Sequence, residues 1–205
     1  MSYRSYRGDS IAPVLAIIIL CFVVYIAAIL PRFLDFLTYD IVRLFGLQPA
    51  TFIQTPWTIV TSLFVHGSIW HLIFNMLTFY FFGTFLLRLV GTRTFLIIYF
   101  LGGIVGNIFF MLFAFAGFLT SPFSTVIGAS GAIFALGGTL AVVTPRLRVY
   151  VFPIPAPMPI WVAVIGGFFI MSFFSGIAWQ GHLGGLVLGL IAGFILRRTV
   201  RTPYS

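Results

Sequence analysis

The sequence predicts an all-α membrane protein, on the evidence of its composition, its hydropathy and the lengths of its apolar runs. Of its 205 residues, 61% are hydrophobic and 7% are charged, and the mean hydropathy is +1.17, far above that of soluble domains. A spanning helix needs about 20 apolar residues. Six such runs are present, at residues 11–30, 69–87, 94–117, 126–144, 158–177 and 181–196. We therefore expect six transmembrane helices that form a single membrane domain over residues 1–205.

The positive charges predict how these helices cross the membrane. The net charge is +8, and all eleven basic residues are arginines at the ends of apolar runs, which argues against a nucleic-acid-binding patch. With the N-terminus inside, two arginines are outer, Arg32 and Arg43. Nine are inner: Arg4, Arg7, Arg88, Arg93, Arg146, Arg148, Arg197, Arg198 and Arg201. Because inner loops carry excess arginine, we expect residues 1–10 and 197–205 to be cytoplasmic tails. With no targeting segment apparent, we expect a prokaryotic plasma membrane.

The two connections with most information are residues 31–65 and 153–159. In the outer loop 31–65, apolar residues are mixed with Asp35, Asp40 and Arg43, so we expect short amphipathic helices that lie in the membrane interface. A partly apolar loop that covers the helix ends is the alternative. The proline-rich stretch 153–159 cannot continue a helix because proline lacks the amide hydrogen, and it predicts an inner turn between the fourth and fifth helices.

Small residues predict close packing of the fourth and sixth helices. The sixth run has glycine at every fourth position, at Gly185, Gly189 and Gly193. The fourth run has a face of small residues at Ser130, Gly137 and Ala141, with Gly131 and Gly138 beside it. Such faces let two backbones approach closely where lipid removes the hydrophobic driving force. We expect these two helices to cross tightly.

Polar side chains inside the membrane are few, and each is a functional candidate because its burial in lipid is costly. The chain has no Glu or Lys, and its three Asp residues lie outside the runs, which argues against proton-coupled transport. The polar residues that remain are His66, His71, Asn75, Asn107, Ser130 and His182. Ser130, His182 and His71 precede the next inner arginine by 16, 15 and 17 residues. At about 1.5 Å per residue, these three side chains share one depth.

Ser130 is placed as a nucleophile would be. We expect its helix to begin near this residue, so residues 121–129 enter the membrane as irregular backbone, which is tolerated only beside protein or a water-filled cleft. We therefore expect a hydrated cleft open to the outside. Gly128 and Gly131 leave room for a substrate backbone, and the Ser130 amide is a free donor at the start of a helix.

The histidines and Asn75 complete the parts needed for acyl transfer. His71 and Asn75 are four residues apart and point to the same side of their helix. A nucleophile, a histidine base and donors for an oxyanion are the groups that this chemistry requires. Because no acid lies in the membrane, a dyad of Ser130 and His182 is favoured over a triad. Each motif alone is more often a feature of helix packing, and it is their occurrence together at one depth on three alternate helices that favours catalysis. We expect His66 to hold the outer loop and Asn107 to bond to a neighbouring helix.

In these residues the chain resembles the rhomboid intramembrane serine proteases. The resemblance lies in a Trp57-containing outer loop, "HGSIWHLIFN" at 66–75, "GASG" at 128–131 and "GHLGGLVLG" at 181–189. It implies the minimal six-helix form, with Ser130 as nucleophile, His182 as general base and then acid, and an oxyanion hole made by His71, Asn75 and the Ser130 amide. Supporting roles are implied for Gly128, Gly131, Phe134 and Gly185. No cofactor or metal is implied, and the substrates would be single-span membrane proteins.

Two residues depart from the pattern of this family, and other functions stay open. Thr58 stands where arginine often follows the loop tryptophan, and Phe134 stands where tyrosine often packs on the catalytic histidine. A catalytically silent relative that binds membrane clients and a small-solute transporter are the alternative functions. The natural substrate, the cleavage site, the oligomeric state and the element that admits substrate are not determined by the sequence.

Overall fold

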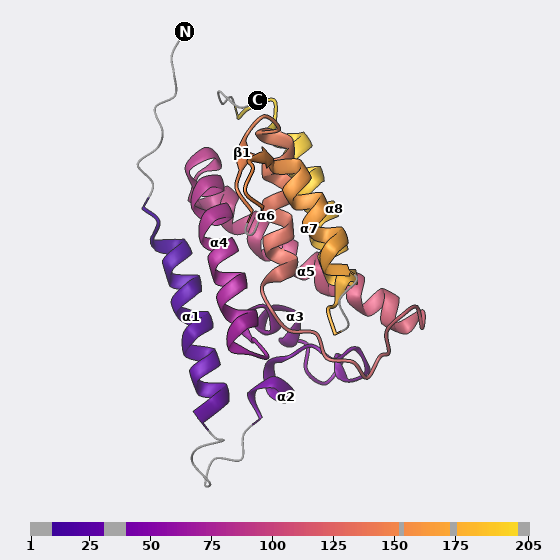
Figure 1. The fold of residues 1–205 in the computed structure, drawn as a ribbon. Helices are drawn as coiled ribbons and strands as arrows, with labels where there is room; N and C mark the ends of the chain where they lie inside the picture. The colour runs from indigo at the N-terminus through magenta and orange to yellow at the C-terminus, as the bar shows by residue number, and fades with distance from the viewer. Residues whose placement is uncertain (1–9, 31–39, 152–153, 173–175, 201–205) are drawn as a thin grey trace.

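The computed structural model describes residues 10–30, 40–151, 154–172 and 176–200, and it is mostly helical (Figure 1). Within these ranges, four helices are long and apolar enough to span a membrane: α1 (Ala12–Ile29), α4 (Ile69–Val90), α5 (Thr92–Phe115) and α8 (Trp179–Leu196). Two apolar helices are shorter, α6 (Ser130–Val143) and α7 (Ile160–Ser172). By length alone the structure therefore supports four spans, and the count of six stays a prediction.

The outer loop forms short helices at the end of the molecule opposite the two termini (Figure 1). These are α2 (Ile41–Phe45), η2 (Pro49–Thr51), α3 (Thr58–Thr61) and η3 (Ser62–Phe64). The carboxylate of Asp40 caps α2 by accepting hydrogen bonds from the amides of Val42 and Arg43. Residues 31–39, the other part of the predicted loop, lie outside the described residues.

A small β-hairpin connects α6 to α7 where the sequence predicted only a turn. Strand β1 (Arg148–Val149) pairs antiparallel with β2 (Met158–Pro159). The amide of Ile160, the first residue of α7, donates to the Leu147 carbonyl at 2.8 Å and closes the base of the hairpin. The Ile160 side chain is buried in the core, so the hairpin is fixed to the bundle at its base.

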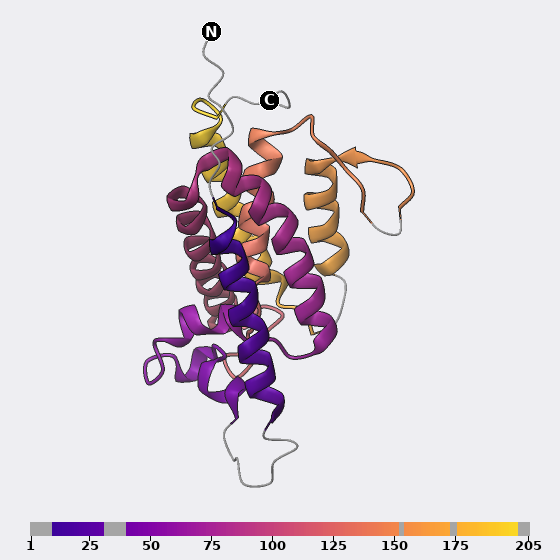
Figure 2. The same ribbon diagram turned by 90° about the vertical axis from the view of Figure 1, so that its left-hand side faces the viewer.

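Helix α6 is the centre of the bundle. It contacts α4, α5, α7 and α8, and ten of its residues are buried. Helix α1 lies at the edge, where it packs on α4 through Val14, Ile17 and Cys21. The views in Figures 1 and 2 agree that α6 lies between its neighbours while α1 covers one side of the molecule.

The crossing of α6 and α8 is tight, as expected, but α6 uses a different face from the predicted one. A side chain on Gly185 or Gly189 would collide with the backbone of Gly131 or Ala135 on α6. The Thr139 hydroxyl adds a hydrogen bond of 3.1 Å to the Gly189 carbonyl. The predicted contact face of Ser130, Gly137 and Ala141 was wrong at Gly137, and Gly131 and Gly138, which were expected to lie beside that face, meet α8. Gly137 faces Phe82 of α4 and Val164 of α7 instead, because α6 is surrounded and its small residues serve several neighbours.

The arginines follow the predicted asymmetry. Those at or next to helix ends on the side of the termini are Arg88, Arg93, Arg146, Arg148, Arg197 and Arg198, whereas Arg43 lies in α2 at the opposite end (Figure 1). The other four, Arg4, Arg7, Arg32 and Arg201, lie outside the described residues.

We expect Gly189→Ala to destabilise the fold, because its new methyl group meets the Ala135 backbone, which cannot move aside without shifting α6. Overpacking of this kind costs about 1–3 kcal/mol, measurable as a lower thermal unfolding temperature of the detergent-purified protein. Gly166→Ala on α7 is the matched control, because nothing lies within 4 Å of its new methyl group. Equal unfolding temperatures for the two variants would contradict a tight α6–α8 contact.

Candidate active site

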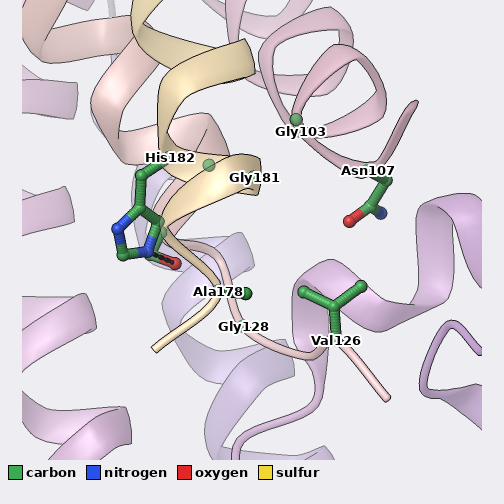
Figure 3. Close-up of a pocket in the computed structure, with 10 residues that line it drawn as sticks. Gly103, Asn107, Val126, Gly128, Ala178, Gly181 and His182 are labelled. Carbon is green, nitrogen blue, oxygen red and sulfur yellow. Dashed lines mark hydrogen bonds between the residues drawn. The ribbon is translucent and has the colours of Figure 1, made fainter. Parts of the chain in front are cut away.

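Ser130 and His182 meet at the ends of α6 and α8, although 52 positions separate them in the chain. Ser130 is the first residue of α6, and His182 lies in the first turn of α8. The His182 Nε2 atom lies 2.7 Å from the Ser130 Oγ atom (Figure 3). The other ring nitrogen, Nδ1, is buried and has no hydrogen-bond partner. When Nε2 accepts the hydroxyl proton, Nδ1 must carry the ring's own proton, so the pair has the arrangement expected of a dyad.

Backbone hydrogen bonds hold the irregular segment that leads into Ser130. Val126 forms an antiparallel bridge with Leu47 of the outer loop, with hydrogen bonds of 2.8 and 3.0 Å. The Gly128 amide then donates to the Ser62 carbonyl at 2.9 Å. Gly128 has φ of +113°, a conformation that favours glycine. These contacts fix the position at which α6 begins, and the Ser130 amide, in the first turn, has no carbonyl within its helix to bond.

His71 lies directly against this segment. A side chain on Gly128 would lie 2.8 Å from the Cε1 and Nε2 atoms of His71, and its distance to the Ser130 Oγ atom would be 3.9 Å. The glycine therefore lies between the imidazole and the hydroxyl, where its lack of a side chain permits the approach. The Asn75 amide group donates to the His71 carbonyl at 2.8 Å, one turn earlier in the same helix. This leaves one N–H of Asn75 available, while its Oδ1 atom is buried without a partner.

The remaining predicted residues surround the pair. The Phe134 ring lies one turn after Ser130 and packs on the His182 ring, with centroids 4.7 Å apart. Gly131 lines the pocket beside the pair, so the expectation that it makes room for substrate stays a prediction, and it also packs against α8. A side chain there would meet the Gly181 carbonyl of α8 at 3.3 Å, so Gly131 permits helix packing. Gly185 packs against the Gly131 carbonyl and serves the same contact.

His66 is close to His71, a contact that sequence reasoning missed. It is buried, and its ring packs edge-on against the His71 ring with centroids 5.1 Å apart. Its Nδ1 atom lies 3.3 Å from the Phe64 carbonyl, and its Nε2 atom is buried without a partner. Burial, with a smaller effect of His71, lowers the pKa of His66 to about 4. His66 is therefore neutral at pH 7 and adds no positive charge beside His71.

Asn107 and Ser62 form a second support that only the structure reveals. Asn107 was expected to bond to a neighbouring helix. It does bond to one, the short outer-loop helix α3: its amide group donates to the Ile59 carbonyl of α3 and to the Ser62 hydroxyl that follows, both at 2.8 Å. Because the Ser62 carbonyl binds the Gly128 amide, this network links α5 to the segment before Ser130. The sequence singled out Asn107 as a polar residue in an apolar run but contained no signal for Ser62.

The outer loop has anchors of its own despite the departure at Thr58. Trp57 donates from its indole nitrogen to the Leu44 carbonyl at 3.1 Å, and Thr61 donates to the Phe45 carbonyl at 2.9 Å. Thr58 is buried, and its hydroxyl donates to the Thr55 carbonyl at 2.6 Å. The loop is therefore held by local hydrogen bonds at the position where the family often has arginine.

A small pocket opens at the Ser130–His182 pair. Its wall includes Asn107 and Gly103 of α5, Val126 and Gly128 of the irregular segment, and Ala178 and Gly181 beside His182 (Figure 3). Glycines therefore form much of the wall next to the hydroxyl. Within the described ranges, no group of three or more His, Cys, Asp or Glu side chains lies close enough together to hold a metal ion.

The fold and the site define a multi-pass helical membrane protein with a serine–histidine pair in its interior. The sequence matches the Rhomboid domain over residues 54–199, a range that contains Ser130, His182, His71 and Asn75. The chain belongs to the rhomboid family, which confirms the resemblance seen in the sequence.

Known members of this family align with 65% to 73% of the chain. Identity to Rhomboid protein 1, mitochondrial, of Saccharomyces cerevisiae is 28% over 154 residues, covering 73% of this chain and 44% of that protein. Identity to rhomboid protease GluP of Bacillus subtilis is 35% over 141 residues, covering 68% of this chain and 26% of GluP. Identity to Rhomboid-like protease 3 of Toxoplasma gondii is 34% over 143 residues, covering 65% of this chain and 49% of that protein. The alignments span less than half the length of each of these relatives.

We expect Gly128→Ala to slow the reaction of Ser130 with an alkyl fluorophosphonate, because the new methyl group would push the His71 ring and the Ser130 segment apart. The labelling rate, followed by mass spectrometry, should fall at least about tenfold, the effect of a misplacement of about 1 Å. Gly117→Ala is the matched control, since Gly117 also has positive φ, +67°, but nothing lies within 4 Å of its new methyl group. Equal labelling rates in the two variants would mean that the close approach of His71 to Gly128 is unimportant.

Proposed function

We propose that this protein is an intramembrane serine endopeptidase that cleaves single-span membrane proteins with a Ser130–His182 dyad. The 2.7 Å contact between the hydroxyl and the imidazole is the observation that carries this proposal. Membership of the rhomboid family, in which named relatives include rhomboid proteases, supports the same reaction class. A silent relative would need neither the contact nor the pocket beside it.

In the first half of the reaction, the Ser130 Oγ atom attacks the scissile carbonyl carbon while His182 Nε2 takes the hydroxyl proton. The tetrahedral intermediate collapses when His182 returns this proton to the leaving amine nitrogen. An ester between Ser130 and the N-terminal part of the substrate remains. Burial of the dyad in a wall of apolar and glycine residues strengthens these electrostatic interactions relative to water.

The oxyanion of the intermediate needs donors on the His71 side of the pocket. The Ser130 amide is one, because a residue in the first turn of a helix has no intrahelical acceptor. The His71 imidazole and the second N–H of Asn75 are the other two, and His71 is in contact with the glycine that precedes the nucleophile by two positions. We infer that Asn75 reaches the oxyanion only after its side chain rotates within its own turn of α4.

In the second half, a water molecule deprotonated by His182 attacks the ester carbonyl, and the proton then returns to Ser130. This step needs water within the membrane. The pocket beside Ser130 and the irregular segment that leads into it are consistent with a hydrated opening at the end where α2 and α3 lie. If the arginine-rich end is cytoplasmic, as the positive-inside rule predicts, this opening faces the outside.

Substrate must approach the dyad from the lipid, and of the helices that contact α6, α7 packs least on the rest of the bundle. It packs on α6 chiefly through Val164 and Phe168, and Gly166 and Gly167 face open space. The Phe134 ring connects this helix to the site, since it packs on both Phe168 and His182. A substrate helix must also unwind locally, because a helical carbonyl is already hydrogen-bonded. We therefore infer a preference for segments with small or helix-breaking residues.

We expect Ser130→Ala and His182→Ala each to lower kcat/KM at least about 1,000-fold, since each removes a member of a unit that acts together. The assay uses the purified chain and a panel of model single-span substrates in proteoliposomes, with products identified by mass. Ser172→Ala on α7 is the control, because its hydroxyl bonds only to the Phe168 carbonyl in its own helix. Failure of the wild type to cleave any substrate or react with fluorophosphonate would favour the client-binding alternative. Solute flux that survives Ser130→Ala would favour a transporter.

We expect His71→Ala to lower kcat about 100- to 1,000-fold with little change in KM, the loss typical of one oxyanion donor. Steady-state kinetics on the best substrate of the panel measures both constants. Thr78→Ala is the matched control on the same helix, because its hydroxyl bonds to the Phe74 carbonyl within α4. A rise in KM with unchanged kcat would instead place His71 in substrate binding.

A further inference from the structure

The β1–β2 hairpin has a cluster of exposed apolar side chains that the proposed reaction does not use. Tyr150 is 74% exposed, Ile154 is 43% exposed and Val151 is 37% exposed. Trp161, which follows β2 in the first turn of α7, is 48% exposed. Single exposed apolar residues are common, but several on one short hairpin indicate a surface that is covered in use. Arg148, Tyr150, Val151, Ile154 and Trp161 are termed the hairpin surface below.

The base of the hairpin is rigid, so this surface has a defined orientation. Side chains alternate along a strand: Val149 packs on the core, whereas Arg148 and Tyr150 on either side of it are exposed. The Ile154 amide donates to the Val151 carbonyl at 2.7 Å, a hydrogen bond that links the two exposed apolar residues. The exposed side chains are therefore held outside the bundle and are not left there by fraying.

The hairpin lies beside the helices rather than beyond their ends. Figure 2 shows the segment from β1 to β2 projecting sideways from the bundle, next to α7 and level with its first turns. Figure 1 gives the same level, below the ends of α6 and α8. Because α7 beside the hairpin is apolar, and four helices of the bundle are long and apolar enough to cross a membrane, we infer that the hairpin lies at the edge of the bilayer and not in bulk water.

The charges around the hairpin fit an anionic leaflet. Arg148 is exposed on β1, and helix ends on the same side of the molecule carry Arg88, Arg93, Arg197 and Arg198. Asp40, the acidic residue of the described ranges, lies in the outer loop at the opposite end. Clusters of arginine beside a membrane attract anionic headgroups, and tyrosine and tryptophan favour the same interfacial layer.

Prolines before and within β2 make insertion into the interface less costly. Pro155 and Pro157 precede β2 and Pro159 ends it, and because proline has no amide hydrogen, this segment presents fewer donors that would need water. A hairpin surrounded by water can satisfy its backbone donors with solvent, so it gains nothing from several prolines. The exposed side chains beside these prolines are apolar.

We propose that the hairpin surface is an interfacial anchor, in which Tyr150, Val151 and Ile154 insert among the lipids of an anionic leaflet while Arg148 binds headgroup phosphates. Since β2 runs directly into α7, the anchor fixes the N-terminal end of the helix that, among those in contact with α6, packs least on the rest of the bundle. The anchor does not depend on the proposed peptidase activity, because it rests on contacts of the hairpin alone.

Spin-label accessibility tests the anchor in the full chain. Cys21 is the single cysteine, so Cys21→Ala gives a clean background, and its thermal unfolding shows whether the fold is kept. A nitroxide is then attached after Tyr150→Cys, after Phe74→Cys on the exposed apolar face of α4, or after Thr199→Cys beyond α8. Each protein is reconstituted in phosphatidylcholine vesicles with or without phosphatidylglycerol. The ratio of collision rates with oxygen and with a water-soluble nickel chelate reports depth.

We expect the oxygen-to-nickel ratio at position 150 to resemble that at 74 and to exceed that at 199. Phosphatidylglycerol should raise the ratio at 150 further, and Arg148→Gln should remove this increase. A ratio at 150 equal to that at 199 in both kinds of vesicle would overturn the anchor. Spin–spin broadening at 150 that disappears on dilution with unlabelled protein would also overturn it, because a second copy of the chain would then cover the surface.

Discussion

The close approach of α6 and α8 is the constraint on which the site depends. Gly185 and Gly189 allow the α8 backbone to pack directly on the backbone of Gly131 and Ala135. Such close packing is needed because no hydrophobic driving force holds helices together in lipid. Ser130 and His182 lie in the first turns of α6 and α8. The distance between the two helix axes therefore determines the distance between the hydroxyl and the imidazole. The packing of the bundle and the geometry of the candidate dyad are therefore one property of the molecule.

The site is held firmly on one side and loosely on the other. The outer loop fixes the segment before Ser130 through Leu47, Ser62 and Asn107, so a few hydrogen bonds at the end of the bundle determine where α6 begins. On the other side, α7 meets the site through Phe134 and Phe168 and has open space at Gly166. The proposed reaction on a substrate helix that arrives from the lipid needs a serine held in place beside a helix that can move aside. The proposed anchor at the hairpin would hold the N-terminal end of α7.

Features with a local pattern could be predicted from the sequence, and features made by distant backbone could not. Helix α6 begins at Ser130 as expected, because the 16 residues from Ser130 to Arg146 place the serine below the outer surface of the membrane, with residues 121–129 left to enter as irregular backbone. The glycine spacing in α8 indicated the tight crossing. The contact face of α6 was mispredicted because a helix buried on all sides has no single small-residue face. Three features could not be predicted because they are made by backbone atoms, which every residue type has. They are the Leu47–Val126 bridge, the hydrogen bond to the Ser62 carbonyl and the two-residue strands of the hairpin.

A structure of the protein after reaction with an alkyl fluorophosphonate tests the central claim most directly. The account predicts a bond between phosphorus and the Ser130 Oγ atom, with the phosphonyl oxygen within hydrogen-bonding distance of the Ser130 amide and the His71 ring, and with His182 Nε2 still beside the modified oxygen. Modification of another residue, or a phosphonyl oxygen that points away from His71 while α6 and α8 keep their contact, would contradict it.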